Sequence, residues 1–80
     1  MKKHIAEAWR SFEEVLPEQA GPLQRKETRR AFYAGANALF HIMLENVSDD
    51  PEFTDQDQEL GDAVQAEFEE FVADVQAGRA

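Results

Sequence analysis

Apolar residues recur at intervals of three and four positions in three separate stretches of this 80-residue chain, and such spacing is typical of amphipathic α-helices. The stretches cover about residues 3–16, 22–46 and 54–77. The strict alternation that marks a half-buried strand is absent from the sequence. A chain of this length has room for one hydrophobic core. The sequence therefore predicts one all-α domain over residues 1–80, a three-helix bundle with a long central helix.

Each of the three stretches begins or ends at residues that favour the start or the end of a helix. Proline disfavours helix in the residue before it, so Pro17 should end the first helix. Proline suits the first helical turn, which places the start of the second helix at Pro22. Thr54 and Asp57 have the spacing of a capping box at the start of the third helix. Gly78 is a natural stop for that helix.

The segment from Ala31 to Leu44 is apolar nearly all round, which predicts a central helix with neighbours on several faces. Gly35 and the alanines around it suggest that another helix approaches closely there. The segment is short for a membrane span, which needs about 20 apolar residues. The chain has no cysteine and its N-terminus lacks the apolar run of a signal peptide. We therefore expect a cytoplasmic protein that does not enter membranes.

Charge is distributed very unevenly along the chain. Residues 46–78 contain eleven acidic side chains and no lysine or arginine, and the net charge of the whole chain is −9. Like charges gathered on one surface repel one another unless a partner neutralises them. This polarity indicates a cationic partner.

Most carboxylates of the third predicted helix fall opposite its apolar stripe on a helical wheel. The eight acidic residues from Asp55 to Asp74 span about 29 Å, or roughly one charge per 3.6 Å of helix. Phosphates along one DNA strand are spaced at ~3.4 Å. We interpret the acidic face as a partner-binding surface that imitates nucleic acid, and the alternative is a solvated face that maintains solubility. The predicted contact residues are Asp55, Glu59, Asp62, Glu69, Glu70 and Asp74.

Four cations, Arg25, Lys26, Arg29 and Arg30, lie near the start of the second predicted helix. These cations can pair with the acidic helix, either within the chain or across a dimer. Alternatively, they can bind a phosphate or a nucleic-acid backbone, or they can remain solvated. The acidic remainder of the chain would repel nucleic acid, so direct nucleic-acid binding is the least favoured of the three. Together with Tyr33, these four residues are the candidate dimer or partner contacts.

Residues suited to catalysis or metal binding are few. The run that begins at Asp55 resembles the start of a calcium loop, but Leu60 replaces the required glycine and Ala66 the bidentate glutamate. His4 and His41 have neither a cysteine nor a paired histidine at zinc-ligand spacing. Neither a nucleophile motif nor a glycine-rich phosphate loop is present. We therefore predict no catalytic residues, no metal site, no cofactor and no enzymatic activity.

The stretch from Glu27 to Ala36 reads E-x-R-x-A-F-Y-x-G-A, and Trp9 and Phe12 upstream read W-x-x-F. This pattern, with its intervening proline break, resembles small helical proteins encoded by phages and prophages. The resemblance covers roughly the first half of the chain. It implies a phage origin, and small acidic phage proteins include anti-CRISPR inhibitors, some of which resemble DNA.

These observations lead to one functional hypothesis and one alternative. The first is a small acidic phage-type inhibitor that binds a basic, nucleic-acid-binding surface of a host protein complex in the bacterial cytoplasm. A CRISPR effector is the sharpest candidate for this partner. The alternative is a non-enzymatic helical homodimer, or a structural or regulatory interaction module of phage origin.

Overall fold

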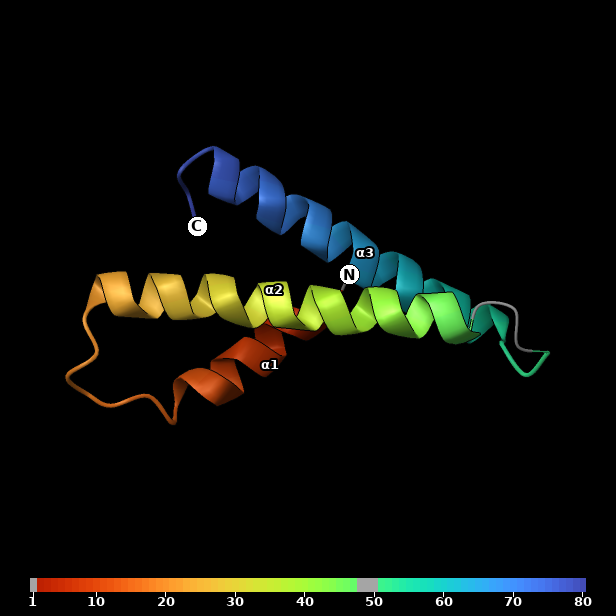
Figure 1. The fold of residues 1–80 in the computed structure, drawn as a ribbon, viewed down its shortest axis with the longest axis horizontal. Coiled ribbons are helices and arrows are strands. Elements are labelled where there is room, and N and C mark those ends of the chain that lie inside the picture. Colours follow the sequence, from red (N-terminus) through yellow and green to blue (C-terminus); the bar gives the residue numbers. More distant parts are fainter. Residues whose placement is uncertain (1, 48–50) are drawn as a thin grey trace.

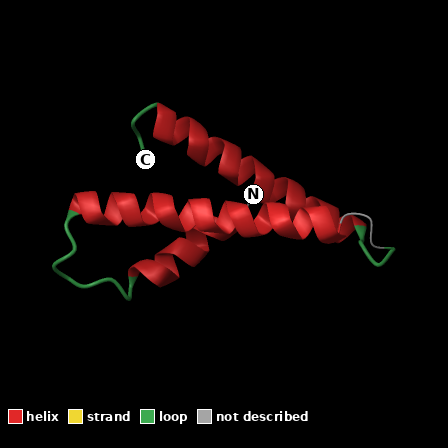
Figure 2. Ribbon diagram, viewed as in Figure 1, coloured by secondary structure: helices red, strands yellow, loops and turns green. Residues whose placement is uncertain are grey.

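The computed structural model describes residues 2–47 and 51–80 and contains three α-helices (Figures 1 and 2). These are α1 (His4–Glu13), α2 (Pro22–Val47) and α3 (Asp55–Gln76). No strand occurs in the described part of the chain. The prediction of an all-α fold with three helices is confirmed, and each predicted boundary lies within three residues of the observed one.

Helix α1 ends at Glu13, three residues earlier than predicted. Beyond Glu14, two amide groups bond to carbonyls only three residues back: Val15 to Phe12 at 3.0 Å, and Leu16 to Glu13 at 3.1 Å. Such bonds tighten the final turn of a helix. Pro17 disfavours α-helix in the preceding residue, so its effect extends into the last turn.

The predicted starts of α2 and α3 are confirmed. Pro22 is the first residue of α2, and the carbonyl of Gly21 accepts the first helical bond, from Arg25, at 3.0 Å. At α3, the Asp57 amide donates to Thr54 Oγ1 at 3.1 Å, and the Thr54 amide donates to Asp57 Oδ2 at 3.0 Å. These reciprocal bonds complete the capping box.

Helix α3 stops at the predicted glycine. Gly78 has a φ of 77°, in the left-handed region that only glycine adopts at little cost. Its amide donates to the Val75 carbonyl at 3.1 Å, and the Arg79 amide donates to the Asp74 carbonyl at 2.8 Å. This pair of bonds is a Schellman motif, which satisfies the last carbonyls of the helix.

The buried centre of the fold is aromatic and small. Trp9, Tyr33, Val64 and Phe68 are buried, and the Tyr33 ring stacks on Phe71 with ring centres 3.9 Å apart. Partly buried apolar side chains surround this cluster: Ile5, Leu16, Phe32, Ala36, Phe40 and Phe71. Since these residues come from all three helices, a single core joins α1, α2 and α3.

The helices form an elongated and open arrangement (Figure 1). The radius of gyration is 14.5 Å, compared with about 12 Å for a typical domain of this length. The expectation that α2 is covered on several faces is wrong, because Leu39, Ile42 and Met43 are 59%, 58% and 53% exposed. A side-chain carbon added at Gly35 would meet nothing within 4 Å, so none of the three described helices approaches it closely. Helix α2 therefore presents an uncovered apolar face.

None of the helices within residues 2–47 and 51–80 combines the length and the hydropathy needed to cross a bilayer.

Candidate partner-binding surface

Five of the six predicted contact residues are exposed on α3, Glu70 among them, and Asp74 is half-buried. The other four exposed residues are Asp55, Glu59, Asp62 and Glu69. None of these four forms an ion pair with a cation of the described chain. Two accept hydrogen bonds from neutral glutamines one turn earlier, at 2.9 Å for Asp62 and 3.2 Å for Glu69. The outer face of α3 therefore carries four carboxylates that no cation of residues 2–47 or 51–80 neutralises.

The other two predicted contact residues have cationic partners. Lys3 Nζ lies 2.6 Å from Glu70 Oε1, and the hydrogen bond to this carboxylate raises the pKa of Lys3. Arg79 Nη2 lies 2.8 Å from Asp74 Oδ1. These contacts lie at the surface and contribute little to stability, but they partly offset two negative charges. The structure thus divides the predicted acidic face into a paired part and an unpaired part.

The carboxylates that lack a cationic partner are spaced more widely along α3 than its eight acidic residues taken together. The four unpaired carboxylates run from Asp55 to Glu69, about 21 Å of helix, so they are spaced at roughly 7 Å. This is about twice the ~3.4 Å between phosphates of one DNA strand. The face is anionic and linear, and its four unpaired charges alone do not match the phosphate repeat.

Glu67 has a different role from the other acidic residues of α3. Its side chain is buried, with 6% exposed, and it accepts backbone hydrogen bonds from Ile5 at 2.9 Å and Ala6 at 2.7 Å. Both amides belong to the first turn of α1, where no other helical residue can satisfy them. The cap residue of α1, Lys3, provides no side-chain cap of its own. Glu67 therefore caps α1 from a neighbouring helix and places a negative charge at the positive end of its dipole.

The sequence gives no local signal for this cap. On the helical wheel Glu67 flanks the acidic face, just as Asp74 does, although Asp74 remains near the surface. The decisive factor is tertiary: the start of α1 packs against the middle of α3.

Tyr33, predicted as a dimer or partner contact, lies in the core with 3% of its surface exposed. Its ring packs on Phe71, and its hydroxyl lies 3.4 Å from Glu67 Oε2. A partner therefore cannot reach Tyr33 in this arrangement. Burial raises the pKa of the Tyr33 hydroxyl; nearby Arg29 opposes this rise and the negative charge of Glu67 adds to it.

This shift predicts a loss of stability at high pH. The unfolded chain releases the tyrosine proton near its ordinary pKa of 10.0, whereas the folded chain holds it to higher pH. Above the pKa of the unfolded chain, the unfolded state therefore binds fewer protons than the folded state. The free energy of unfolding should fall as pH rises through this range. Because Tyr33 is the only tyrosine, its ultraviolet absorbance reports this titration directly. We expect a higher midpoint in the native protein than in urea, and identical midpoints would contradict the prediction.

The four cations at the start of α2 do not pair with carboxylates of α3 anywhere in the described chain. Arg25 lies 3.5 Å from Glu13 Oε2 and donates to the Ala20 carbonyl at 3.2 Å, which joins α2 to the preceding loop. Lys26 is exposed. The interpretation that this group pairs with the acidic helix in the same chain is therefore wrong.

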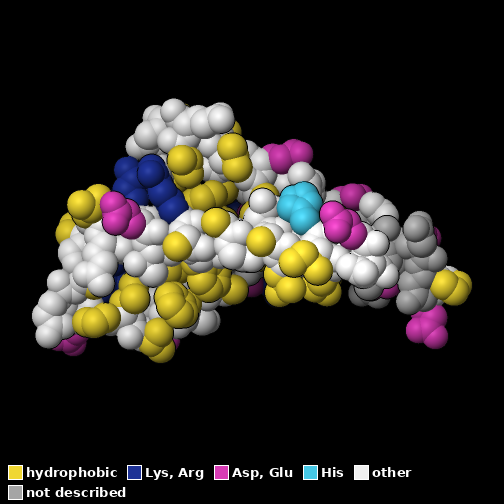
Figure 3. All heavy atoms as spheres, viewed as in Figure 1, with side chains coloured by type: hydrophobic (Ala, Val, Ile, Leu, Met, Phe, Trp, Pro, Cys, Tyr) yellow, Lys and Arg dark blue, Asp and Glu magenta, His cyan; other side chains and the backbone are white. Residues whose placement is uncertain are grey.

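Arg29 and Arg30 instead connect α2 to the end of α3 and to the residues that follow it. The Arg29 guanidinium carbon lies 5.1 Å from the Tyr33 ring centre and 5.0 Å from that of Phe71, which is cation–π geometry. Arg30 Nε donates to the main-chain oxygen of Ala80 at 2.9 Å. On the face in Figure 3, basic side chains gather between the start of α2 and the end of α3. Together with Arg25, three of the four predicted contact cations are thus engaged within the chain.

The described residues contain no group of three or more histidine, aspartate or glutamate side chains that could hold a metal ion. The outer carboxylates of α3 lie on a convex helix face, whereas acid–base catalysis requires a substrate held within hydrogen-bond reach.

We found no match to this chain among protein-family models, curated proteins or solved structures. The functional argument therefore depends on the geometry of the chain itself.

Proposed function

We propose that this protein is a non-enzymatic inhibitor whose acidic α3 face binds a basic, nucleic-acid-binding surface of another protein. The observation that carries the proposal is the row of four carboxylates, Asp55, Glu59, Asp62 and Glu69, without a cationic partner in the described chain. A basic groove that binds phosphates would also attract such a row, so the protein would compete with nucleic acid for it.

The exposed face of α3 lacks the oppositely charged pairs, one helical turn apart, that stabilise many exposed helices. A Glu–Lys pair four residues apart contributes about 0.2–0.5 kcal/mol, and like charges at that spacing cost a similar amount. Asp55 and Glu59 have this unfavourable spacing, and α3 contains no lysine or arginine at all. An external cationic surface would relieve the repulsion, which supports binding as the role of this face.

The narrower form of the proposal is an anti-CRISPR type of inhibitor that acts in a bacterial cytoplasm. It rests on the phage-like pattern from Glu27 to Ala36, together with the net charge of −9. The wide spacing of the unpaired carboxylates favours recognition of a basic groove in general over a faithful copy of the DNA backbone.

Affinity capture from a bacterial lysate tests the proposal. The immobilised protein should retain a basic nucleic-acid-binding protein or complex at low salt and release it at high salt, because salt screens exposed charges beyond ~8 Å at physiological ionic strength. Duplex DNA added at low salt should displace the same partner. A captured partner that resists both treatments would contradict electrostatic competition.

A second function, a homodimeric interaction module, is favoured by the apolar side chains that α2 exposes, Leu39, Ile42 and Met43. A patch of this kind is often an interface. Sedimentation equilibrium at micromolar concentrations separates the two functions, since the module requires a dimer and the inhibitor does not.

A further inference from the structure

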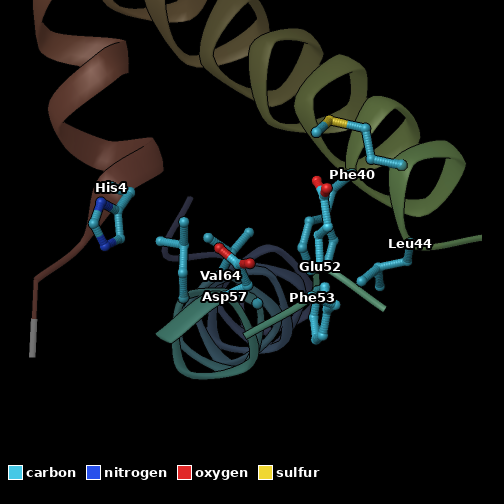
Figure 4. A pocket seen from close by; sticks show the side chains of 10 residues that line it. His4, Phe40, Leu44, Glu52, Phe53, Asp57 and Val64 are labelled. Atoms are coloured by element: carbon cyan, nitrogen blue, oxygen red, sulfur yellow. The ribbon is translucent and has the colours of Figure 1, made fainter. Parts of the chain in front are cut away.

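An apolar hollow of about 640 Å³ opens where the end of α2 meets the start of α3 (Figure 4). Its walls come from α2, from the segment before α3, and from α3 itself, and His4 of α1 stands at one side. The apolar lining consists of Phe40, Met43, Leu44, Phe53, Leu60 and Val64. A smaller hollow shares Phe40, Leu44, Phe53 and Gly61 with the first. The two hollows together form an open groove rather than an enclosed cavity.

Aside from His4, the charged residues that line this groove within the described part of the chain are acidic. Glu52 and Asp57 line the larger hollow, and Asp62 lines the smaller one. Among the described residues, neither hollow has a lysine or arginine in its lining, and His4 is the one basic side chain there. An apolar floor with carboxylates beside it is complementary to a segment that is apolar on one face and cationic on its flanks.

Gly61 provides an independent indication that the space is kept open. It lies inside α3, where glycine lowers helix stability relative to alanine, and it borders both hollows. A side-chain carbon built there would meet nothing within 4 Å, so packing within the described chain does not require glycine. The missing side chain leaves room for a group from outside.

We propose that this groove receives the apolar face of a cationic amphipathic helix supplied by the binding partner. The inference rests on the proposed function, because it names a second contact with the same basic partner. Apolar anchors three and four positions apart on the incoming helix would enter the groove, and flanking lysines or arginines would face Glu52, Asp57 and Asp62. A second copy of this chain fits less well, since each copy carries a net charge of −9.

A synthetic peptide of leucine and lysine, about 15 residues or four helical turns long, is a suitable probe. Its leucines are placed at helical spacing, and a scrambled peptide of the same composition has no apolar face. We expect the amphipathic peptide to bind at least tenfold more tightly than the scrambled one. The two peptides carry the same charge, so this ratio measures the groove rather than the acidic surface.

Two substitutions at Gly61 separate groove binding from folding. Gly61→Met should fill the groove and abolish the tenfold preference, whereas Gly61→Ala, the matched control, should retain most of it. Both variants should resist urea at least as well as the parent, because both residues favour helix over glycine. Loss of binding in a protein that is no less stable cannot come from unfolding.

The inference is overturned if the parent binds both peptides equally, or if Gly61→Met keeps the full preference. It is also overturned if the parent sediments as a dimer that Gly61→Met dissociates, since the occupant is then a second copy. Failure of the proposed function has a different result: the partner captured from the lysate resists salt and DNA even though the peptide preference persists.

Discussion

Replacement of Glu67 by alanine is expected to lower the free energy of unfolding by about 3 kcal/mol, the largest effect of any single acidic residue on α3. The change removes two charge-assisted hydrogen bonds, of 2.9 Å from Ile5 and 2.7 Å from Ala6. It leaves partly buried amides without an acceptor and removes the negative charge at the start of α1. The melting temperature should fall on the order of 15 °C, as measured by circular dichroism.

Two further variants isolate the cap from a general effect of charge. Glu67→Gln retains one carbonyl acceptor but no charge. Its free energy of unfolding should therefore fall by about half as much as that of Glu67→Ala. Glu69→Gln, two residues further on the exposed face, should change stability by no more than about 0.5 kcal/mol. Equal effects at both positions would show that Glu67 is not a cap.

Reversal of three unpaired carboxylates, Glu59→Lys, Asp62→Lys and Glu69→Lys, is expected to weaken binding to the captured basic partner at least a hundredfold. Each reversal adds two positive charges, so the net charge changes from −9 to −3. Like charges brought together at an interface cost several kcal/mol, and every ~1.4 kcal/mol is a tenfold change in affinity. The helical circular dichroism should be unchanged, because all three side chains point into solvent.

A charge-matched control distinguishes this face from bulk charge. Glu14, Glu18 and Glu45 are exposed and lie outside α3. Their joint replacement by lysine gives the same net charge of −3, and it should cost less than tenfold in affinity. If the two triple variants bind equally, overall charge governs the association and the α3 face has no special role.

The helix boundaries were predictable because the signals that set them are local. Pro22, the Thr54–Asp57 pair and Gly78 act within one turn of the chain, and each forms the cap or stop that its residue type favours. The exposure of Asp55, Glu59, Asp62 and Glu69 also followed from helical periodicity alone.

The partners of the charged side chains were not predictable, because they depend on how the helices cross. On the helical wheel Glu67 and Asp74 flank the acidic face alike, yet Glu67 meets the first turn of α1 and Asp74 pairs with Arg79 near the surface. Arg29 lies over aromatic rings, and Arg30 donates a hydrogen bond to a main-chain oxygen fifty residues away. Only the tertiary arrangement separates these roles.

The uncovered face of α2 has a similar cause. An apolar segment predicts burial, but it does not specify whether the covering surface belongs to the same chain. In this fold, α1 and α3 pack around Tyr33, and Leu39 and Ile42 point elsewhere. Because two helices cannot enclose a third, the sequence pattern overestimated the burial of α2.

Trp9, the only tryptophan, is a built-in optical probe for the shortest helix. Its emission responds when α1 leaves the other two helices and water reaches the indole, whereas ellipticity is dominated by the 26 residues of α2 and the 22 of α3. Urea titrations followed by both signals therefore distinguish two modes of unfolding. Superimposable curves mean that the three helices melt as one unit, and an earlier fluorescence transition means that α1 detaches first.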